Sequence, residues 1–211
     1  MAKFLTEPDA QRIADAVRNV ESRTEAELVP VVALQSDDYR YIPVLTVLFL
    51  AMVFPSIFWV FGVPWPLPVP LDPYTGQLIL ATVGIALVQW TPLRHKLVPR
   101  YIKHRRAARM AREQFVEQSV HLAPNHCGVL LFVSVAEHYV EILADQGLAD
   151  RVDNAEWQKA VDDFTGLVRQ GKVAEGFEAA IADIGEILCR VAPVAEPKDR
   201  NALPDRLVVI G

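Results

Sequence analysis

Two long apolar segments in the first half of the chain interrupt an otherwise amphipathic pattern. The first runs from Tyr41 to about Val63 and the second from about Gln77 to Leu93, and neither contains a charged residue. A bilayer-spanning helix needs about 20 mostly apolar residues, which the first segment provides. The second is shorter and suits a thin or locally adapted bilayer. The pattern predicts a transmembrane helical hairpin over residues 41–93, and the alternative is a pair of buried core helices.

The distribution of basic residues predicts how this hairpin is oriented. The loop at residues 64–76 contains no Lys or Arg, whereas basic residues follow the second segment closely. Positively charged residues near spans stay on the cytoplasmic side. We therefore expect a multi-pass protein of the inner (plasma) membrane with both termini in the cytoplasm. The predicted membrane-surface residues are Arg94, Lys96, Arg100, Lys103, Arg105 and Arg106.

The rest of the chain alternates between helical and strand-like patterns. Thr6 is a plausible N-cap for a helix over residues 6–23, and Asp153 or Asn154 caps a later amphipathic helix that carries Trp157. Pro30 cannot donate a ladder hydrogen bond, which places it at a sheet edge or a strand start. The predicted strands are 28–34, 128–135 and 138–144, the further helices are 98–120 and one around 177–188, and residues 207–210 form an edge strand or stay loose.

These elements indicate an α/β fold built as an α/β/α sandwich around a small mixed sheet. A lone helix and strand before residue 40 are not stable alone, so strand 28–34 is expected to pair with the two later strands, with helices on both faces. The predicted organisation is 1–40 as the first part of the domain, 41–93 as the transmembrane hairpin, 94–193 as a basic helix and the remainder of the domain, and 194–211 as a tail.

Composition adds two constraints. The 211 residues carry a formal net charge of −5, with basic residues concentrated after the second apolar segment and acidic residues towards the two ends. The chain has only two cysteines, Cys127 and Cys189. Two isolated cysteines near apolar stretches indicate a reducing compartment rather than a disulfide framework.

Several sequence positions resemble the TPM domain family. The similarity lies in residues 5–39 and 128–192, and its strongest positions are Gly128, Leu130, Leu131, Glu141, Gly147, Leu148, Asp153, Gly176 and Phe177. The resemblance implies an α/β/α sandwich, with the apolar hairpin as an insertion typical of a bacterial membrane-protein subgroup. For activity it implies three alternatives: an assembly, repair or accessory role, phosphatase activity, or calcium binding. Asp145 stands where the family has the first glycine of a Gly-x-Gly-Leu-like turn.

An acidic stretch around this turn is the candidate metal site. Hard cations such as calcium and magnesium prefer several carboxylate or carbonyl oxygens. The candidate ligands are Glu141, Asp145, Asp150 and Asp153. The alternative is a solvated turn in which Asp153 caps the following helix. The spacing of His121, His126, Cys127 and His138 matches no standard zinc motif.

These observations favour a non-catalytic accessory, assembly or repair factor that is anchored in a membrane and acts on other membrane proteins. The chain has no P-loop and no Cys-x5-Arg signature, so a phosphatase reaction requires a metal held near Asp145. The alternatives are thus a metal-dependent phosphatase and a calcium- or magnesium-binding sensor. The basic segment is expected to contact anionic lipid headgroups. Nucleic acid is not an expected partner, because the basic residues lack interleaved aromatic side chains.

Overall fold

The computed structural model of the chain describes residues 5–39, 41–62, 64, 73–90, 98–194, 203 and 206–210. The chain divides into two compact units. One consists of residues 1–36 and 104–211, and the other of residues 37–103. The first unit is called the α/β domain below and the second the apolar hairpin. The α/β domain is therefore assembled from two separate stretches of sequence.

A four-stranded mixed sheet forms the centre of the α/β domain, in the order β3-β2-β1-β4. Its strands are β1 (Glu27–Ala33), β2 (Gly128–Ser134), β3 (Tyr139–Ala144) and β4 (Val208–Ile210). β1 is parallel to both β2 and β4, and β3 is antiparallel to β2. The predicted pairing of the first three strands is confirmed. The apolar end of the tail, left open between two alternatives, forms the strand β4.

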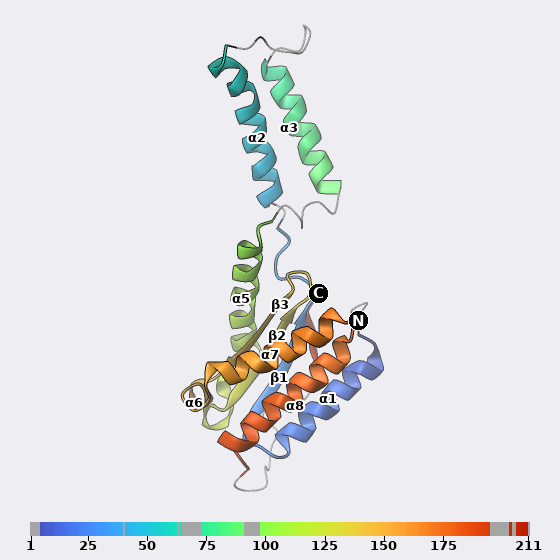
Figure 1. Ribbon diagram of the computed structural model, residues 1–211, viewed down its shortest axis with the longest axis vertical. Helices are drawn as coiled ribbons and strands as arrows, with labels where there is room; N and C mark the ends of the chain where they lie inside the picture. Colours follow the sequence, from blue (N-terminus) through green and yellow to red (C-terminus); the bar gives the residue numbers. More distant parts are fainter. Residues whose placement is uncertain are drawn as a thin grey trace. The chain divides into compact units, whose positions relative to one another are not determined.

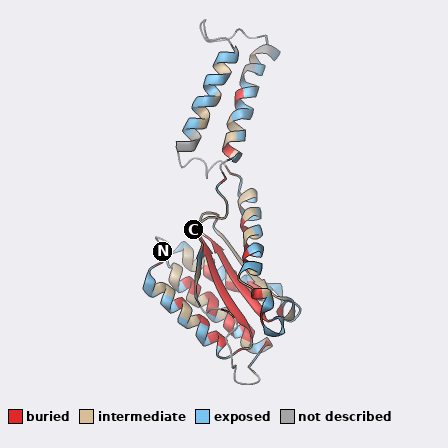
Figure 2. Cartoon of the chain, turned by 180° about the vertical axis from the view of Figure 1, so that it is seen from behind, coloured by how far each residue is buried: buried red, intermediate tan, exposed pale blue. Residues whose placement is uncertain are grey.

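Both faces of the sheet are covered by helices (Figure 1). On one face, apolar side chains of the sheet pack with those of α1 (Glu7–Glu21), α7 (Asn154–Arg169) and α8 (Val173–Val191). On the other face, Ala107 and Ala111 of α5 (Arg100–Glu117) join a second, smaller cluster with the sheet. Every residue of β1 and β2 is buried, as the red strands of Figure 2 show. Burial on both faces explains why these strands lack the apolar–polar alternation of a half-exposed sheet.

Pro30 does not lie in an outer strand, because β1 pairs on both sides. β4, however, pairs only with Val31–Ala33 and does not reach Pro30. On that side, the Leu28 N–H donates to Glu21 Oε1 (2.9 Å) and the Leu34 N–H to the Ile210 carbonyl (2.8 Å). N–H groups alternate in direction along a strand, so the backbone nitrogens of Leu28, Pro30 and Leu34 face the same side of β1. At Pro30 that side has no β4 residue opposite it, so the proline leaves no hydrogen bond of the sheet unmade. Pro30 thus occupies a position that is unpaired on one side, as expected for a proline, although β1 as a whole is an inner strand.

Three short helices complete the described part of the α/β domain. They are η1 (Val120–Leu122), η2 (Pro124–His126) and α6 (Gln146–Ala149). η1 and η2 lead from α5 into β2, and α6 directly follows β3. The predicted helices and strands are all present, with ends shifted by a few residues at most.

The apolar hairpin consists of α2 (Tyr41–Val60) and α3 (Pro73–Trp90), which lie side by side and antiparallel. A Cβ added to Gly84 would lie 2.7 Å from Cγ1 of Val47, so the glycine gives this valine its place between the helices. Residues 41–58 have a mean hydropathy of 2.2, and by length and composition this stretch alone, among the described residues, is sufficient to cross a membrane. α3 begins at Pro73, earlier than the expected Gln77, and its apolar part, Tyr74–Leu87, is shorter.

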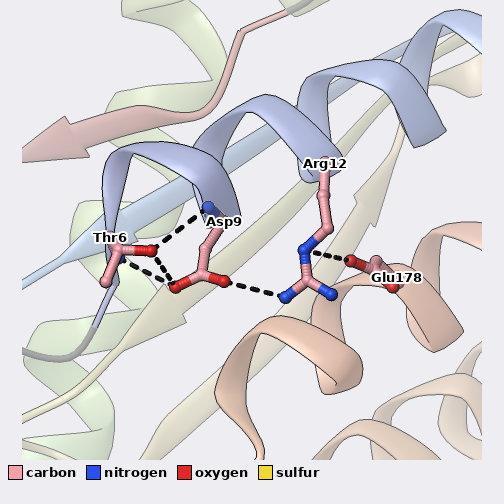
Figure 3. Close-up of polar contacts among 4 residues, drawn as sticks. All are labelled: Thr6, Asp9, Arg12 and Glu178. Atoms are coloured by element: carbon pink, nitrogen blue, oxygen red, sulfur yellow. Dashed lines mark hydrogen bonds and ion pairs between the residues drawn. The ribbon is translucent and has the colours of Figure 1, made fainter.

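A reciprocal capping arrangement fixes the start of α1 (Figure 3). The Thr6 hydroxyl and N–H donate to Asp9 Oδ2 over 2.6 and 2.9 Å, and Thr6 Oγ1 accepts from the Asp9 N–H. Arg12 donates to Asp9 Oδ1 over 2.8 Å and also reaches Glu178 Oε1 of α8 at 3.3 Å. The two hydrogen bonds from Thr6, followed by that from Arg12, hold the pKa of Asp9 at about 2, below its ordinary value of 3.8.

We expect Asp9→Asn to destabilise the protein at neutral pH but not near pH 2. Because the folded-state pKa of Asp9 is depressed, its stabilising contribution is present above pH 3.8 and is lost as the pH falls through about 2. The measurement is the free energy of unfolding of the wild type and the variant as a function of pH. A difference between them that stays constant from pH 6 to pH 2 would contradict this assignment.

Candidate functional site

The candidate site lies at the end of the sheet where β2 begins and β3 ends. The antiparallel register places Val129 opposite Ala144, so the residues just before β2 lie close to those just after β3. The Asp145 N–H continues this ladder by donating to the Gly128 carbonyl over 2.9 Å. The arrangement brings the η2 segment beside the start of α6.

Asp145 and His126 form the central contact of this site. His126 Nδ1 lies 3.2 Å from Asp145 Oδ2, and the other carboxylate oxygen of Asp145 accepts the Gln146 N–H at 2.8 Å. The Asp145 side chain is 14% exposed, whereas that of His126 is 71% exposed. The carboxylate is thus held in place by its own helix cap, and the imidazole presents its other nitrogen to solvent.

The backbone around His126 is strained. Both Asn125 and His126 have positive φ angles, of 54° and 53°, a region that residues other than glycine adopt at a cost. Asn125 is fixed from outside this turn by a hydrogen bond from its side-chain amide to Glu25 Oε2 (3.2 Å). Gly147 allows the turn to approach α6, since a Cβ there would lie 2.5 Å from the Asn125 carbonyl oxygen. These contacts hold His126 beside Asp145.

Cys127 follows His126 in the sequence, but its thiol is buried rather than presented to solvent. It is a free cysteine with 3% of its surface exposed, and its thiol contacts the Asn125 carbonyl oxygen at 3.5 Å. Burial is the main cause of a raised pKa of this thiol, and Glu25 and Asp145 act in the same direction. A buried thiol that resists deprotonation is a poor nucleophile and a poor metal ligand.

The structure does not bring the four predicted metal ligands together. Asp145 and Asp153 are N-caps of α6 and α7, and Asp150 is the C-cap residue of α6. Glu141 lies within β3 and accepts a hydrogen bond from the Tyr139 hydroxyl (2.9 Å), whose pKa is raised mainly by burial and also by this bond. Among the residues with described positions, no three Asp, Glu, His or Cys side chains are grouped as ligands of one ion would be.

The predicted membrane-surface residues fall partly outside the described residues. Arg94 and Lys96 lie in the undescribed stretch 91–97. The other four, Arg100, Lys103, Arg105 and Arg106, lie in the first half of α5. Arg105 is exposed, and Arg106 is half-buried.

The proximity of His126 and Asp145 was not predicted from the sequence. The signal was present in the hairpin itself, since a turn centred between Ala136 and Glu137 places residues near 126 opposite residues near 147. In the sequence, His126 stands out only as a possible zinc ligand. A zinc site needs three or four protein ligands, so a zinc motif could not reveal a contact between one histidine and one aspartate.

The comparisons with known proteins agree with the fold. The TPM domain profile matches residues 96–187, which extend from before α5 into α8. The chain is also similar to the BA42 protein from the psychrophilic bacterium Bizionia argentinensis, whose structure was solved by NMR. Their TM-score is 0.61 at 17% sequence identity, with 99% of this chain and 97% of that chain covered. At this identity the likeness concerns the fold alone. Among curated proteins, none matches the chain.

The TPM resemblance seen in the sequence is therefore confirmed for the second part of the α/β domain, up to residue 187. The profile match does not extend to residues 5–39, where the resemblance stays a prediction. In the structure, however, this first part supplies α1 and β1 to the same sheet and core.

We expect Gly147→Ala to destabilise the protein by about 1–3 kcal/mol, because the new methyl group meets two backbone carbonyls that cannot rotate away. The matched control is Gly166→Ala in α7, where a Cβ has no neighbour within 4 Å. This control is expected to stabilise the helix by about 0.5–1 kcal/mol. Denaturant unfolding of both variants measures the difference. Equal effects of the two substitutions would show that α6 does not pack against the His126 turn.

Proposed function

We propose that the apolar hairpin inserts into a membrane and anchors the α/β domain as a non-catalytic accessory, assembly or repair factor for membrane proteins. The observation that carries the proposal is the exposed apolar surface of α2. Only 12% of the stretch 41–58 is buried, and Phe49, Met52 and Val60 are each more than 60% exposed. A helix that is apolar on all sides belongs in a protein core or a bilayer, and such low burial argues against the core.

The polar side chains of the hairpin support insertion. The hydroxyls of Thr46, Ser56 and Thr82 each donate to the carbonyl four residues earlier in their own helix, over 2.8–2.9 Å. No Asp, Glu, Lys or Arg occurs in either helix. Because these hydroxyls are hydrogen-bonded within their own helix, inserting them into lipid leaves no donor without a partner. These groups suit an anchor better than a path for polar substrates.

The proposed location is the inner membrane, crossed by both α2 and α3, with the α/β domain and both termini in the cytoplasm. The support comes from the Lys- and Arg-free loop and from the basic residues that follow α3. Each of these residues near an anionic surface contributes about 1 kcal/mol to binding. They would hold the first half of α5 close to the headgroups.

The accessory role is supported by how the candidate site uses its polar groups. Asp145 and Asp153 cap helices, and the Cys127 thiol is buried. These three groups are therefore engaged in structure, and of the groups described at this site the His126 imidazole is the one left exposed to contact a substrate. The expected partners are therefore other membrane proteins, which the anchor would hold at high local concentration.

The proposed topology predicts opposite labelling of two cysteine positions in a variant whose own cysteines are replaced by serine. Tyr74→Cys lies at the start of α3 and Gln158→Cys on the exposed surface of α7. A membrane-impermeant maleimide added to intact cells should reach the first position and not the second. Labelling of both positions only after lysis, with the protein recovered in the soluble fraction, would exclude the membrane anchor.

A metal-dependent phosphatase is the second candidate, and the His126–Asp145 contact favours it. An exposed imidazole held by a carboxylate is suited to general base catalysis or to metal ligation. A domain that senses calcium or magnesium is the third candidate, and the acidic residues Glu141, Asp145, Asp150 and Asp153 support it.

The accessory proposal predicts no hydrolysis of a phosphomonoester by the full chain, with or without added calcium or magnesium. Turnover that requires an ion and is lost in both Asp145→Ala and His126→Gln would establish the phosphatase instead. His126→Gln is the safer variant, because Asp145 also caps α6. An ion-dependent increase in melting temperature without turnover would support the sensor, since a ligand that binds only the folded state raises its stability.

A further inference from the structure

The strand β3 has one unpaired side. It is the last strand in the sheet order and pairs with β2 alone. The Asp145 N–H donates to the Gly128 carbonyl, and N–H groups alternate in direction along a strand. The N–H and C=O groups of Val140, Ile142 and Ala144 therefore point away from β2. Within the described part of the chain, no hydrogen bond reaches these outward groups.

β3 lacks most of the features that keep an outer strand from pairing further. Such strands are commonly very short, or carry a proline, a lysine or a bulge. β3 has six residues, contains no proline or lysine, and keeps an unbroken register with β2. Its one charged residue, Glu141, bonds to the Tyr139 hydroxyl on the face that α5 covers. All six residues are half-buried, whereas β2 beside them is buried throughout. The outer side of β3 is thus regular and partly accessible.

The helix that covers β3 on the other face borders this side with uncharged residues. α7 contacts both β3 and α8. Its α8 side is marked by Glu156, which forms an ion pair with Arg190 of α8. Helical spacing places Val161, Thr165 and Val168 on the opposite flank of α7, where all three are half-buried. No charge on this flank opposes the approach of a similar apolar surface.

The α5 face of the same side carries charges of both signs. Burial and the contact with Glu141 raise the pKa of the Tyr139 hydroxyl, and the positive charge of Arg112 in α5 opposes this rise. Arg112 is exposed and acts on the same hydroxyl that Glu141 bonds. Each copy of the chain therefore presents one carboxylate and one guanidinium beside β3. A surface of mixed sign can meet a second copy of itself without net repulsion.

We propose that β3 is the contact between two copies of the chain, which pair antiparallel about a twofold axis at Ile142. Ile142 then faces its own counterpart, and Val140 faces Ala144 of the second copy. All the outward N–H and C=O groups of these three residues gain partners, and the two sheets become one continuous sheet. A contact of this kind requires a self-complementary surface, which the mixed charges and the apolar flank of α7 provide.

The charge of Glu141 selects this register. With Ile142 on the axis, Glu141 lies opposite Leu143 of the second copy. In the register centred on Glu141, the two Glu141 residues form a non-hydrogen-bonded pair with their Cα atoms about 4.5 Å apart. Like charges directly opposite each other destabilise a strand pair. The inference concerns the α/β domain and does not depend on the proposed membrane anchor.

The first test is sedimentation equilibrium of the full chain in density-matched detergent over a range of protein concentrations. The wild type is expected to form a dimer. Val140→Pro removes an outward N–H that no bond within the chain uses, and Val140→Ala is the matched control that keeps it. The proline variant should raise the dissociation constant by about tenfold or more, because one bond is lost from each copy, and the control should raise it less. A wild type that is monomeric throughout, as expected if β3 serves another protein, would overturn the proposal. So would a dimer that Val140→Pro leaves unchanged.

The second test reads the register and does not require the proline variant to fold. Ile142→Cys and Val140→Cys are compared after mild oxidation in a Cys189→Ser background, in which Cys127 is buried. Cα atoms of a hydrogen-bonded antiparallel pair are about 5.5 Å apart, which suits a disulfide. Ile142→Cys should therefore form a linked dimer. Val140→Cys should not, because its counterpart is displaced by four residues, or about 13 Å. Equal linkage of both variants, or none in Ile142→Cys, would overturn the proposed pairing.

Discussion

The parallel pairing of β1 with β2 is the constraint on which the rest of the structure depends. It runs from Glu27 opposite Gly128 to Ala33 opposite Ser134, with residues 34–127 between the strands. Closing a flexible loop of this length costs about 4 kcal/mol of entropy beyond a constant term. The antiparallel packing of α2 and α3 returns the inserted chain to the end from which it started and so lowers this cost. The apolar hairpin is therefore compatible with the sheet because it closes on itself.

Most of the fold could be predicted from sequence patterns because the elements have strong local signals. The apolar run of β2, the Thr6 cap and the helical spacing around Trp157 each have a direct structural counterpart. The place of Pro30 could not be predicted, because it depends on where the three-residue strand β4 ends. That end is a property of tertiary pairing, which propensity does not encode.

The candidate site was harder to predict than the fold. Acidic residues close in sequence suggested one cluster, yet Glu141 points from a strand while Asp145 and Asp153 begin helices. The chain direction changes between these elements, so proximity in sequence does not give proximity of side chains. His126 lies beside Asp145 because the pairing of β2 with β3 brings the segments that flank these strands together. Such contacts require the hairpin register of β2 and β3 to be known first.

The first half of β1, which β4 does not reach, also bears on how the α/β domain avoids pairing with other chains. An open strand edge with free N–H groups is a template for pairing with a second chain and for aggregation. Beyond β4, the Leu28 N–H is already bonded to Glu21, and Pro30 has no N–H to offer. A foreign strand that approached this edge would find neither donor. The features that end the sheet on this side therefore also protect the folded domain from pairing with a second chain at this position.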